Sequence, residues 1–482
     1  MDTSGPQRRG AARLPRTALA SLVGAILSTV PLSGLCLSVD ASTDVSTSAF
    51  VLNAVDAGLN SSADAAFRAE SPTDTEVAAG VVISTTPRTA PLIARTLPNR
   101  VRRDVDPALH SAEFTDHESA DRDAPQTLRT LRALQSRYQR LVDAGGWPVI
   151  QAGPAVAPGG RDSRLRDVRA RLAMTRDIAR AGDSDLLDDE LVAALARFQT
   201  RVQLPPTGHL DDATLTELNV SASARLMSIA LSVSRASNLP HDADQDYVLV
   251  NIAGYKAEYR RGDETLWSGR TMVGKLSTRT PQLESAIDRV VFNPTWIVPN
   301  GIATRSVLPA VIKDPAYLAR KNMRVFDMKW QPVDPDSVDW KAVHASRDRD
   351  IYIRQDAGDD NALGKVKFLF PNKYSVFLHD TQSKHLFDTD MRAYSNGCVR
   401  LENPMALASA MLDAQGLDGE WLREKAQNSQ SPELIALDRP IPVHTLYLTA
   451  ELGEGGQAIF YRDIYGENTE QSYASLVSPT TL

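Results

Sequence analysis

Apolar residues recur every three or four positions in three stretches between residues 125 and 205. This spacing puts side chains on one face of an α-helix, so each stretch predicts an amphipathic helix. The arginines of the second stretch lie off its apolar face. They predict a solvated, salt-bridged surface, with contact to an anionic glycan as the alternative. The three stripes are Leu128, Leu131, Leu134, Tyr138 and Leu141; Leu165, Val168, Leu172 and Ile178; and Leu191, Leu195, Phe198 and Val202.

The third stripe belongs to a compact unit at residues 183–220. A turn is predicted at 205–208 by the run P-P-T-G, and Asp211 stands where the N-cap of a further helix is expected. Periodicity alone indicates a small helical bundle and nothing more specific.

From residue 247 the pattern becomes typical of strands. The run Y-V-L-V-N-I is apolar and β-branched, and two more strands flank the turn Gly262-Asp263. Residues 305–350 interrupt this rhythm with a short helix and a proline-punctuated loop. An insertion of this length inside a β domain predicts a lid or binding loop. Strands then return in G-K-V-K-F-L-F, S-V-F-L-H-D and the tail, and M-A-L-A-S-A-M-L predicts a helix.

The first 124 residues follow neither pattern. Four arginines precede an apolar run in residues 1–41, which predicts a cleaved export signal, with an uncleaved membrane anchor as the alternative. Residues 42–124 are rich in Ser, Thr, Ala and Asp without a sustained period. They predict a disordered tether, although a poorly patterned helix at 50–70 stays open.

Composition narrows the function classes. The 482-residue chain is 42% hydrophobic and 23% charged, with a formal net charge of −7. Its length predicts two or three domains, and its acidic balance argues against nucleic-acid binding. Metal-binding spacings such as HExxH or paired CxxC are missing from the sequence, so no metal and no cofactor are expected.

Candidate chemistry centres on Cys398. The other cysteine, Cys36, lies in the predicted leader, so the exported chain would hold one thiol and no intramolecular disulfide. Gly397 lets the backbone bring amide groups close to a bound carbonyl, and a nearby Arg400 favours the thiolate. His379, at the end of a predicted strand, is the best candidate for the base that a thiol nucleophile needs.

The stretch R-A-Y-S-N-G-C-V-R-L-E-N-P, together with the upstream H-D-T-Q, resembles the active-site motif of the L,D-transpeptidase catalytic domain. The resemblance extends to V-V-F-N-P-T-W-I-V-P, Y-S-V-F-L-H-D-T and the tail strands, and covers roughly residues 125–470. It is to the large Gram-negative members of that family. The unit at 183–220, with its R-F-Q and T-L-T-E-L-N, is similar to a peptidoglycan-binding domain. A spacer without glycan affinity is the alternative for that unit.

The resemblance implies an α+β multidomain chain. A mainly β catalytic domain with a helical lid follows a helical scaffold and a small three-helix peptidoglycan-binding-like domain. The predicted parts are a signal peptide or anchor at 1–41, a tether at 42–124, a helical scaffold at 125–182, the peptidoglycan-binding-like domain at 183–220, a linker helix at 221–245, the catalytic domain at 246–425 with its lid at about 305–350, and C-terminal strands and a tail at 426–482.

The resemblance also assigns roles. Cys398 would be the nucleophile and His379 its proton acceptor, oriented by a backbone carbonyl or by Asp380. The oxyanion and active-site loop would comprise Ser395, Asn396 and Gly397, with the amides of Gly397 and Cys398 as donors. Arg400, Trp330 and Trp340 are candidates for substrate contacts. Plain structural roles, an ion pair for Arg400 and buried anchors for the tryptophans, stay open.

Two positions depart from the family pattern. Asn396 stands where many members carry histidine, and Phe377 stands where relatives often carry tyrosine. Neither change touches the proposed nucleophile or base. They leave open what the side chain at 396 contributes and remove a hydroxyl contact at 377.

The implied reaction is peptidoglycan crosslinking in the periplasm, with two stem peptides as partners and a possible contact to the glycan strand. Carboxypeptidase action, D-amino-acid exchange or attachment of a protein to the wall would use the same thioester chemistry. A non-catalytic wall-binding protein is a third alternative. A papain-like protease fits poorly, because its histidine would follow the cysteine and strands would not surround the site.

Overall fold

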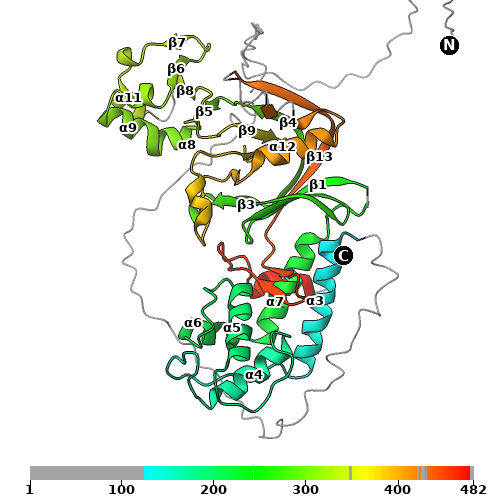
Figure 1. Cartoon of the computed structure of the whole chain (residues 1–482). Helices are drawn as coiled ribbons and strands as arrows, with labels where there is room; N and C mark the ends of the chain where they lie inside the picture. Colours follow the sequence, from blue (N-terminus) through cyan, green and yellow to red (C-terminus); the bar gives the residue numbers. More distant parts are fainter. Residues whose placement is uncertain are drawn as a thin grey trace, which may run out of the picture. The chain divides into compact units, whose positions relative to one another are not determined.

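The computed structural model describes residues 124–242, 244–346, 350–420, 423–424, 429 and 431–477 (Figure 1). The predicted leader and all but the last residue of the predicted tether lie outside this range, so both stay predictions. Within the described part, no helix combines the length and the apolar character that a membrane crossing requires.

Two long helices, α3 (Gln126–Asp143) and α7 (Ala222–Ala236), pack side by side (Figure 1). All five residues of the first predicted stripe are buried on α3, which confirms that stripe. Ser221 begins α7, because its side chain accepts a hydrogen bond from the Ala224 amide. This helix therefore does more than link two units: it shares a core with α3.

The second stripe forms α4 (Arg164–Met174), and here the expectation of a solvated arginine face is wrong. Arg164, Arg169 and Arg171 are buried. The first two each pair with an aspartate, and the guanidinium of Arg171 lies 3.5 Å from the ring centroid of Trp147. Neighbouring segments cover α4 on more than one side, so its polar positions become internal contacts.

Residues 183–220 contain two helices, α5 (Asp189–Arg201) and α6 (Asp212–Leu218). The Asp211 carboxylate accepts from the Thr214 amide at 2.7 Å, as expected of an N-cap. The two helices share one apolar core with α4, which lies in the range assigned to the scaffold. Three helices thus build this core, and whether it binds peptidoglycan stays a prediction.

The central sheet has the strand order β11-β3-β12-β10-β9-β4-β13-β1-β2, and the additional pairing of β2 with β3 closes it on itself. This confirms the predicted β domain. The long hairpin of β2 and β3 surrounds the predicted turn at Gly262-Asp263. The strands are β1 (Asp246–Asn251), β2 (Lys256–Arg261), β3 (Glu264–Gly274), β4 (Leu283–Phe292), β9 (Val366–Leu369), β10 (Leu378–His379), β11 (Ala393–Ser395), β12 (Val399–Leu401) and β13 (Glu433–Leu446).

One face of the closed sheet encloses the largest core. Alternate residues point inward, among them Val248, Ala257, Phe368 and Leu401, and the helix α12 (Pro404–Asp413) adds apolar residues to the same cluster. The opposite face points outward. Over β1 and the end of β13 it is covered by α3 and α7, and elsewhere it carries the site described below.

The C-terminal segment contacts both the central sheet and the helices α3 and α7. β13 lies inside the central sheet between β4 and β1. The hairpin of β14 (Ala450–Leu452) and β15 (Ala458–Phe460) shares a core with α3 and α7, and α14 (Glu470–Val477) follows. Residues 461–465, expected as a strand, form none.

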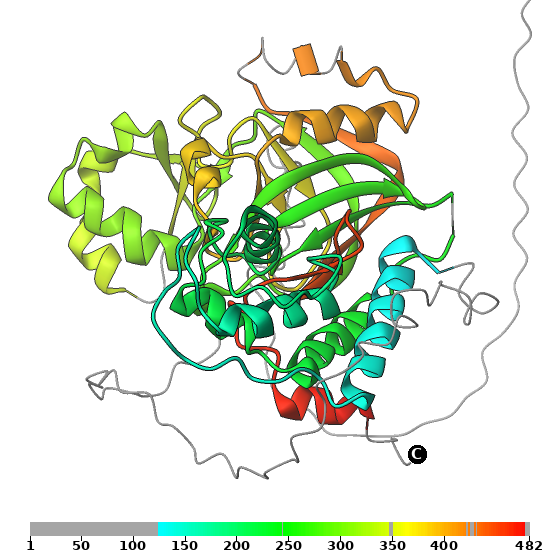
Figure 2. The same cartoon turned by 60° about the horizontal axis from the view of Figure 1, so that its bottom comes forward.

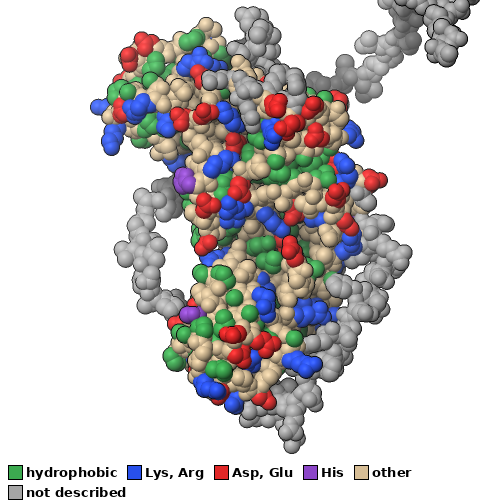
Figure 3. Space-filling model, viewed as in Figure 1, with side chains coloured by type: hydrophobic (Ala, Val, Ile, Leu, Met, Phe, Trp, Pro, Cys, Tyr) green, Lys and Arg blue, Asp and Glu red, His purple; other side chains and the backbone are tan. Residues whose placement is uncertain are grey.

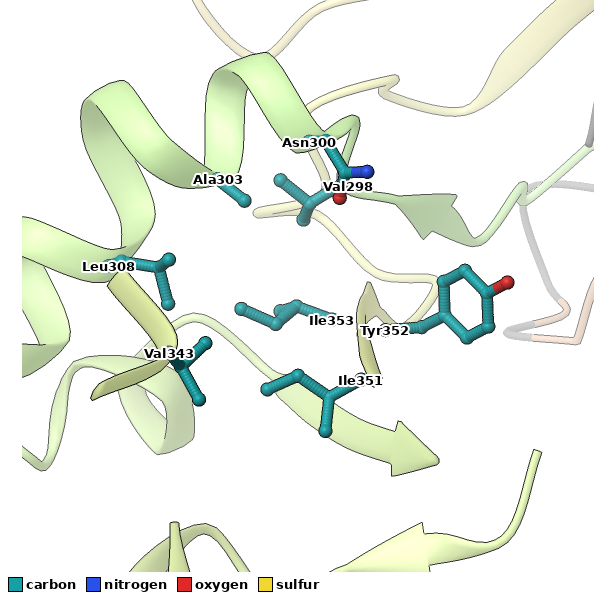
Figure 4. A pocket seen from close by; sticks show the side chains of 8 residues that line it. All are labelled: Val298, Asn300, Ala303, Leu308, Val343, Ile351, Tyr352 and Ile353. Carbon is teal, nitrogen blue, oxygen red and sulfur yellow. The ribbon is translucent and has the colours of Figure 1, made fainter. Parts of the chain in front are cut away.

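The insertion is a small folded subdomain rather than a helix and a loop. Its own four-stranded sheet has the order β5-β8-β6-β7, with helices packed against it in Figures 1 and 2. Figure 4 shows its apolar centre, where side chains including Leu308, Val343 and Ile353 line a cavity of about 10 Å³. That volume holds one water at most. The elements are β5 (Trp296–Ile297), α8 (Asn300–Ile302), η2 (Ala303–Val307), α9 (Leu308–Lys313), α10 (Tyr317–Arg320), β6 (Met323–Asp327), β7 (Pro332–Val333), η3 (Pro335–Ser337), α11 (Trp340–Ala345) and β8 (Ile351–Gln355).

Candidate active site

The strands β10 and β12 bring His379 and Cys398 together. They pair in parallel, with Leu378 opposite Val399 and His379 opposite Arg400. The Val399 amide donates to the Phe377 carbonyl at 3.1 Å, which sets Cys398 beside Phe377. From strand spacing, the Cα atoms of Cys398 and His379 are about 8 Å apart, within reach of a cysteine and a histidine side chain.

Both side chains lie on the outer face of the sheet. Leu378 and Val399 are in the enclosed core, so their neighbours along the strands point the other way. The rings of Phe377 and His379 lie on one side of β10, with their centroids 5.5 Å apart. Opposite residues in a ladder share a face, so Cys398 joins them.

The imidazole of His379 has a defined orientation. Its Nδ1 lies 2.5 Å from the Asp380 backbone carbonyl. A carbonyl only accepts, so Nδ1 carries the proton and Nε2 keeps its lone pair, as a general base requires. The acceptor that orients the histidine is therefore the backbone carbonyl of Asp380.

The Asp380 carboxylate is used elsewhere. It accepts from the Lys384 ammonium and, at 2.8 Å, from the Lys365 amide. Both partners fix the start of the segment that leads from β10 towards the nucleophile. Asp380 therefore supports the backbone that orients His379, and its side chain does not contact the imidazole.

Electrostatics keep the resting pair uncharged. Burial is the main cause that lowers the pKa of His379 to about 3, and the Arg400 charge contributes to the same shift. Burial raises the pKa of the Cys398 thiol to about 11, against the effect of Arg400, although the residue is only half-buried by area. The free protein therefore holds a neutral thiol, whose Sγ donates to the Ser375 carbonyl at 3.9 Å, and a neutral imidazole on the neighbouring strand, so the thiolate must form by proton transfer during attack.

The loop before the thiol adopts a conformation that favours glycine. Gly397 has φ +118°, and a Cβ there would have space, with its nearest neighbour at 3.5 Å. The backbone angle, and not crowding, explains the residue. Ser395 closes the loop, since its hydroxyl donates to the Cys398 carbonyl at 2.5 Å and accepts from the Gly397 amide at 3.0 Å.

The hydrogen bond from the Gly397 amide to Ser395 changes which amide is expected to stabilise the oxyanion. The Gly397 amide is engaged by Ser395 in the free protein, so it is not an open donor as it stands. The Cys398 amide donates to no group in the described part of the chain. The Cys398 amide is thus the better placed of the two predicted donors, and the oxyanion role stays a prediction.

A buried threonine, Thr280, holds the same loop through hydrogen bonds. Thr280 donates from Oγ1 to the Gly397 carbonyl at 2.8 Å and accepts from the Gly274 amide at 2.8 Å. Its own amide donates to the Tyr465 hydroxyl at 3.1 Å. Sequence patterns could not reveal this contact, because it joins segments more than a hundred residues apart.

Arg400 is a cation without a carboxylate partner. It forms no ion pair with any described residue, and its buried Nε has no hydrogen-bond partner there. The alternative of a plain structural ion pair is therefore not what the described residues show. Burial lowers the pKa of Arg400, and the neighbouring Cys398 opposes that change.

The remaining predicted site residues differ in the contacts that they make. Asn396 is exposed and has no hydrogen bond to the described residues, and the Phe377 ring packs near His379 and against the enclosed core. In the lid, Trp340 donates from Nε1 to the Pro335 carbonyl at 3.1 Å and packs on the lid core. The Trp330 ring stacks on Tyr352 with centroids 4.8 Å apart. Both tryptophans thus have structural partners, and substrate contacts for them stay predictions.

Within the described ranges, His, Cys, Asp and Glu form no cluster of three or more that could hold a metal ion.

Comparison with known proteins agrees with this geometry. Residues 245–415 match the family model of the L,D-transpeptidase catalytic domain. A Haemophilus influenzae protein, provisionally named an L,D-transpeptidase, is 35% identical over 233 residues. That match covers 48% of this chain and 46% of the relative, so the chain aligns with just under half of that protein's length.

Solved structures of low similarity include an L,D-transpeptidase from Stackebrandtia nassauensis. It is 14% identical, with 62% of this chain and 96% of that chain covered at a TM-score of 0.23. One from Xylanimonas cellulosilytica is 11% identical, with 61% and 98% covered at a TM-score of 0.20. Scores this low add no weight to the assignment, which rests on the family match at 245–415.

Proposed function

We propose that this chain, whose residues 245–415 form an L,D-transpeptidase catalytic domain, is a peptidoglycan L,D-transpeptidase. One observation carries the proposal. His379, with Nδ1 on a backbone carbonyl and Nε2 free, lies on the strand next to Cys398 and on the same face of the sheet. A thiol nucleophile with an oriented neutral base is the arrangement that acyl transfer requires.

In the first half-reaction, Cys398 attacks the carbonyl that joins diaminopimelate to the terminal D-alanine of a stem tetrapeptide. His379 Nε2 takes the thiol proton as the C–S bond forms, so no free thiolate is needed beforehand. The Cys398 amide stabilises the oxyanion. His379 then returns the proton to the leaving nitrogen, the C–N bond breaks, and D-alanine departs.

In the second half-reaction, an amine of a second stem peptide attacks the thioester. His379 accepts a proton from this amine, a new C–N bond forms, and the C–S bond breaks. The proton passes to the sulfur, which restores the Cys398 thiol. The product is a diaminopimelate–diaminopimelate crosslink. The folded lid, with a core of its own, would exclude water and favour transfer over hydrolysis.

The same thioester would serve a carboxypeptidase, a D-amino-acid exchange enzyme or an enzyme that attaches a protein to the wall. Arg400 favours a substrate with a carboxylate near the thiol, a feature that all of these share. The predicted export signal supports work in the periplasm. A role limited to wall binding is less well supported, since it gives no reason for an oriented His379 beside Cys398.

The test incubates the full chain and its Cys398→Ala variant with disaccharide-tetrapeptides, and mass spectrometry follows dimers and released D-alanine. We expect both products from the wild type and neither from the variant. D-Alanine without dimers would identify a carboxypeptidase instead. A wild type that forms neither product would contradict the proposal.

A further inference from the structure

A groove of about 470 Å³ lies on the outer face of the central sheet, apart from the thiol. Neither Cys398 nor His379 lines it. The lining residues are Gly254, Tyr255, Lys256, Glu258, Ser268, Gly269, Arg270, Arg392 and Glu402. Its volume is in the range of ordinary ligand sites.

The strand register puts this groove on the face that carries Cys398. Ala257 points into the enclosed core, so its neighbours Lys256 and Glu258 point outward. Their partners across the hairpin, Arg270 and Ser268, do the same. On β12 Leu401 is in the core, which sends both Arg400 and Glu402 outward. Along this strand Glu402 is about 13 Å from Cys398.

One lining residue of the groove, Arg392, belongs to the segment that joins the base to the nucleophile, and Arg270 contacts that segment. Arg270 donates to the Phe387 carbonyl at 2.8 Å, in the short helix η4 (Lys384–Asp388) that follows His379. Arg392, shortly before the nucleophile loop, donates to the carbonyls of Thr389 and Tyr255 at 3.0 and 3.3 Å. A ligand in the groove would therefore touch the segment between the two reacting residues.

The groove contains both acidic and basic side chains, and Arg392 is the basic one that forms no ion pair with the described residues. Four of its five charged side chains form ion pairs: Lys256 with Glu258 and Glu451, and Arg270 with Glu402. No carboxylate among the described residues pairs with Arg392. Three of its N–H groups serve backbone carbonyls, so two of the five remain. The groove thus offers a cation for a carboxylate and acidic groups for an amine.

Figure 3 shows acidic and basic side chains interspersed over the visible face. A long polyanion would gain little from such a surface, whereas a short zwitterionic peptide needs a few charges at fixed places.

We propose that this groove holds the second, acceptor stem peptide of the reaction, with Arg392 binding one of its carboxylates. The inference rests on the proposed function. A stem peptide whose diaminopimelate amine attacks at Cys398 extends about 3.5 Å per further residue, so a few residues reach the groove, where Glu402 is about 13 Å from Cys398. The groove is open, as exchange of an acceptor requires. The lid is attached to β4 and β9, which lie on the other side of the site from the groove.

The test uses a stem tripeptide, which lacks D-alanine and can only accept. Ser268 is exposed and its side chain makes no hydrogen bond to the described residues, so Ser268→Trp fills the groove without breaking a side-chain hydrogen bond of the protein. Thr265→Trp, exposed on the same strand outside the groove, is the matched control. Arg392→Gln removes the charge and Arg392→Lys keeps it, which separates charge from support of the loop.

We expect Ser268→Trp to raise the KM for the tripeptide about tenfold or more because the indole occupies the groove, and Arg392→Gln to do the same because it removes a charge-assisted contact. In Ser268→Trp, D-alanine release from the donor should stay within about twofold of the wild type, and Arg392→Lys should recover part of the loss that Arg392→Gln causes. Unchanged acceptor KM in Ser268→Trp would overturn the inference. Slower D-alanine release with an unchanged acceptor KM would assign the groove to the donor and would also overturn it.

A binding measurement separates failure of this inference from failure of the proposed function. Calorimetry follows the tripeptide binding to Cys398→Ala with and without Ser268→Trp. Binding that depends on Ser268 supports the groove even if the wild type turns over no substrate. Binding that Ser268→Trp leaves intact refutes the groove whether or not the enzyme is active.

Discussion

Replacing Thr280 with valine should loosen the nucleophile loop while leaving the packing around it unchanged. The hydroxyl of Thr280 bridges the Gly274 amide and the Gly397 carbonyl, both at 2.8 Å, and the residue is 3% exposed. Valine has nearly the same shape, so no cavity forms. The variant leaves one buried donor and one buried acceptor without a partner.

The size of the effect follows from those two groups. A buried polar group left unpaired costs about 1–3 kcal/mol, so the pair should lower stability by about 2–6 kcal/mol. At about 2–4 °C per kcal/mol for a domain of this size, the melting temperature should fall by roughly 4–24 °C. Displacement of Gly397 also moves the thiol, and a misplacement near 1 Å slows acylation by up to about a hundredfold.

The assay pairs thermal denaturation with the rate of D-alanine release. Thr280→Ser is the control, because it keeps the hydroxyl and removes one methyl group at a cost of about 1 kcal/mol. It should retain most of the activity. A valine variant as stable and as active as the wild type would refute the reasoning, and so would a serine variant that loses as much as valine.

Three further predictions concern the site and the lid. Burial lowers the pKa of His379 to about 3, whereas an unfolded chain protonates near the ordinary value of about 6.5; stability should fall as pH drops through this window, by up to about 1.4 kcal/mol per unit. His379→Asn should flatten that acid limb in urea titrations at several pH values. Arg400→Met should slow alkylation of Cys398 by iodoacetamide at pH 8, since Arg400 favours the thiolate, whereas Arg400→Lys should keep most of the rate; equal rates in both would rule out a charge effect. Trp340→Ala should speed amide hydrogen exchange in β6 and β8 but not in β4, because Trp340 packs on the lid core; exchange that rises equally in β4 would contradict a separate lid core.

Patterns in the sequence predicted the fold where periodicity and burial coincide. The stripe on α3, the N-cap at Asp211 and the hairpin around Gly262 all form as expected, because each depends on neighbouring residues. The arginines of α4 were misjudged, since their burial depends on segments that fold back from elsewhere. The lid contains strands that the sequence pattern did not predict, because the apolar runs there are short and are interrupted by prolines.

At the site, the motif pointed to His379 and Cys398, and the strand register puts them on neighbouring chain segments, two positions apart along the strands. Their roles stay predictions. The sequence left open whether a carbonyl or Asp380 orients the imidazole, because that depends on local backbone geometry. It gave no sign of Thr280, whose partner Gly397 is distant in sequence. Asn396, the departure from the family pattern, is exposed and has no hydrogen bond to the described residues, which leaves the nucleophile and base as they are.

The central claim is that Cys398 forms a thioester with a stem peptide. Its most direct test is the mass of the intact chain after brief exposure to a disaccharide-tetrapeptide, followed by mapping of the modified residue. We predict an adduct equal to the substrate minus D-alanine, located on Cys398 and strongly reduced in His379→Gln. Turnover that proceeds without such an adduct, or that persists in Cys398→Ala, would contradict it.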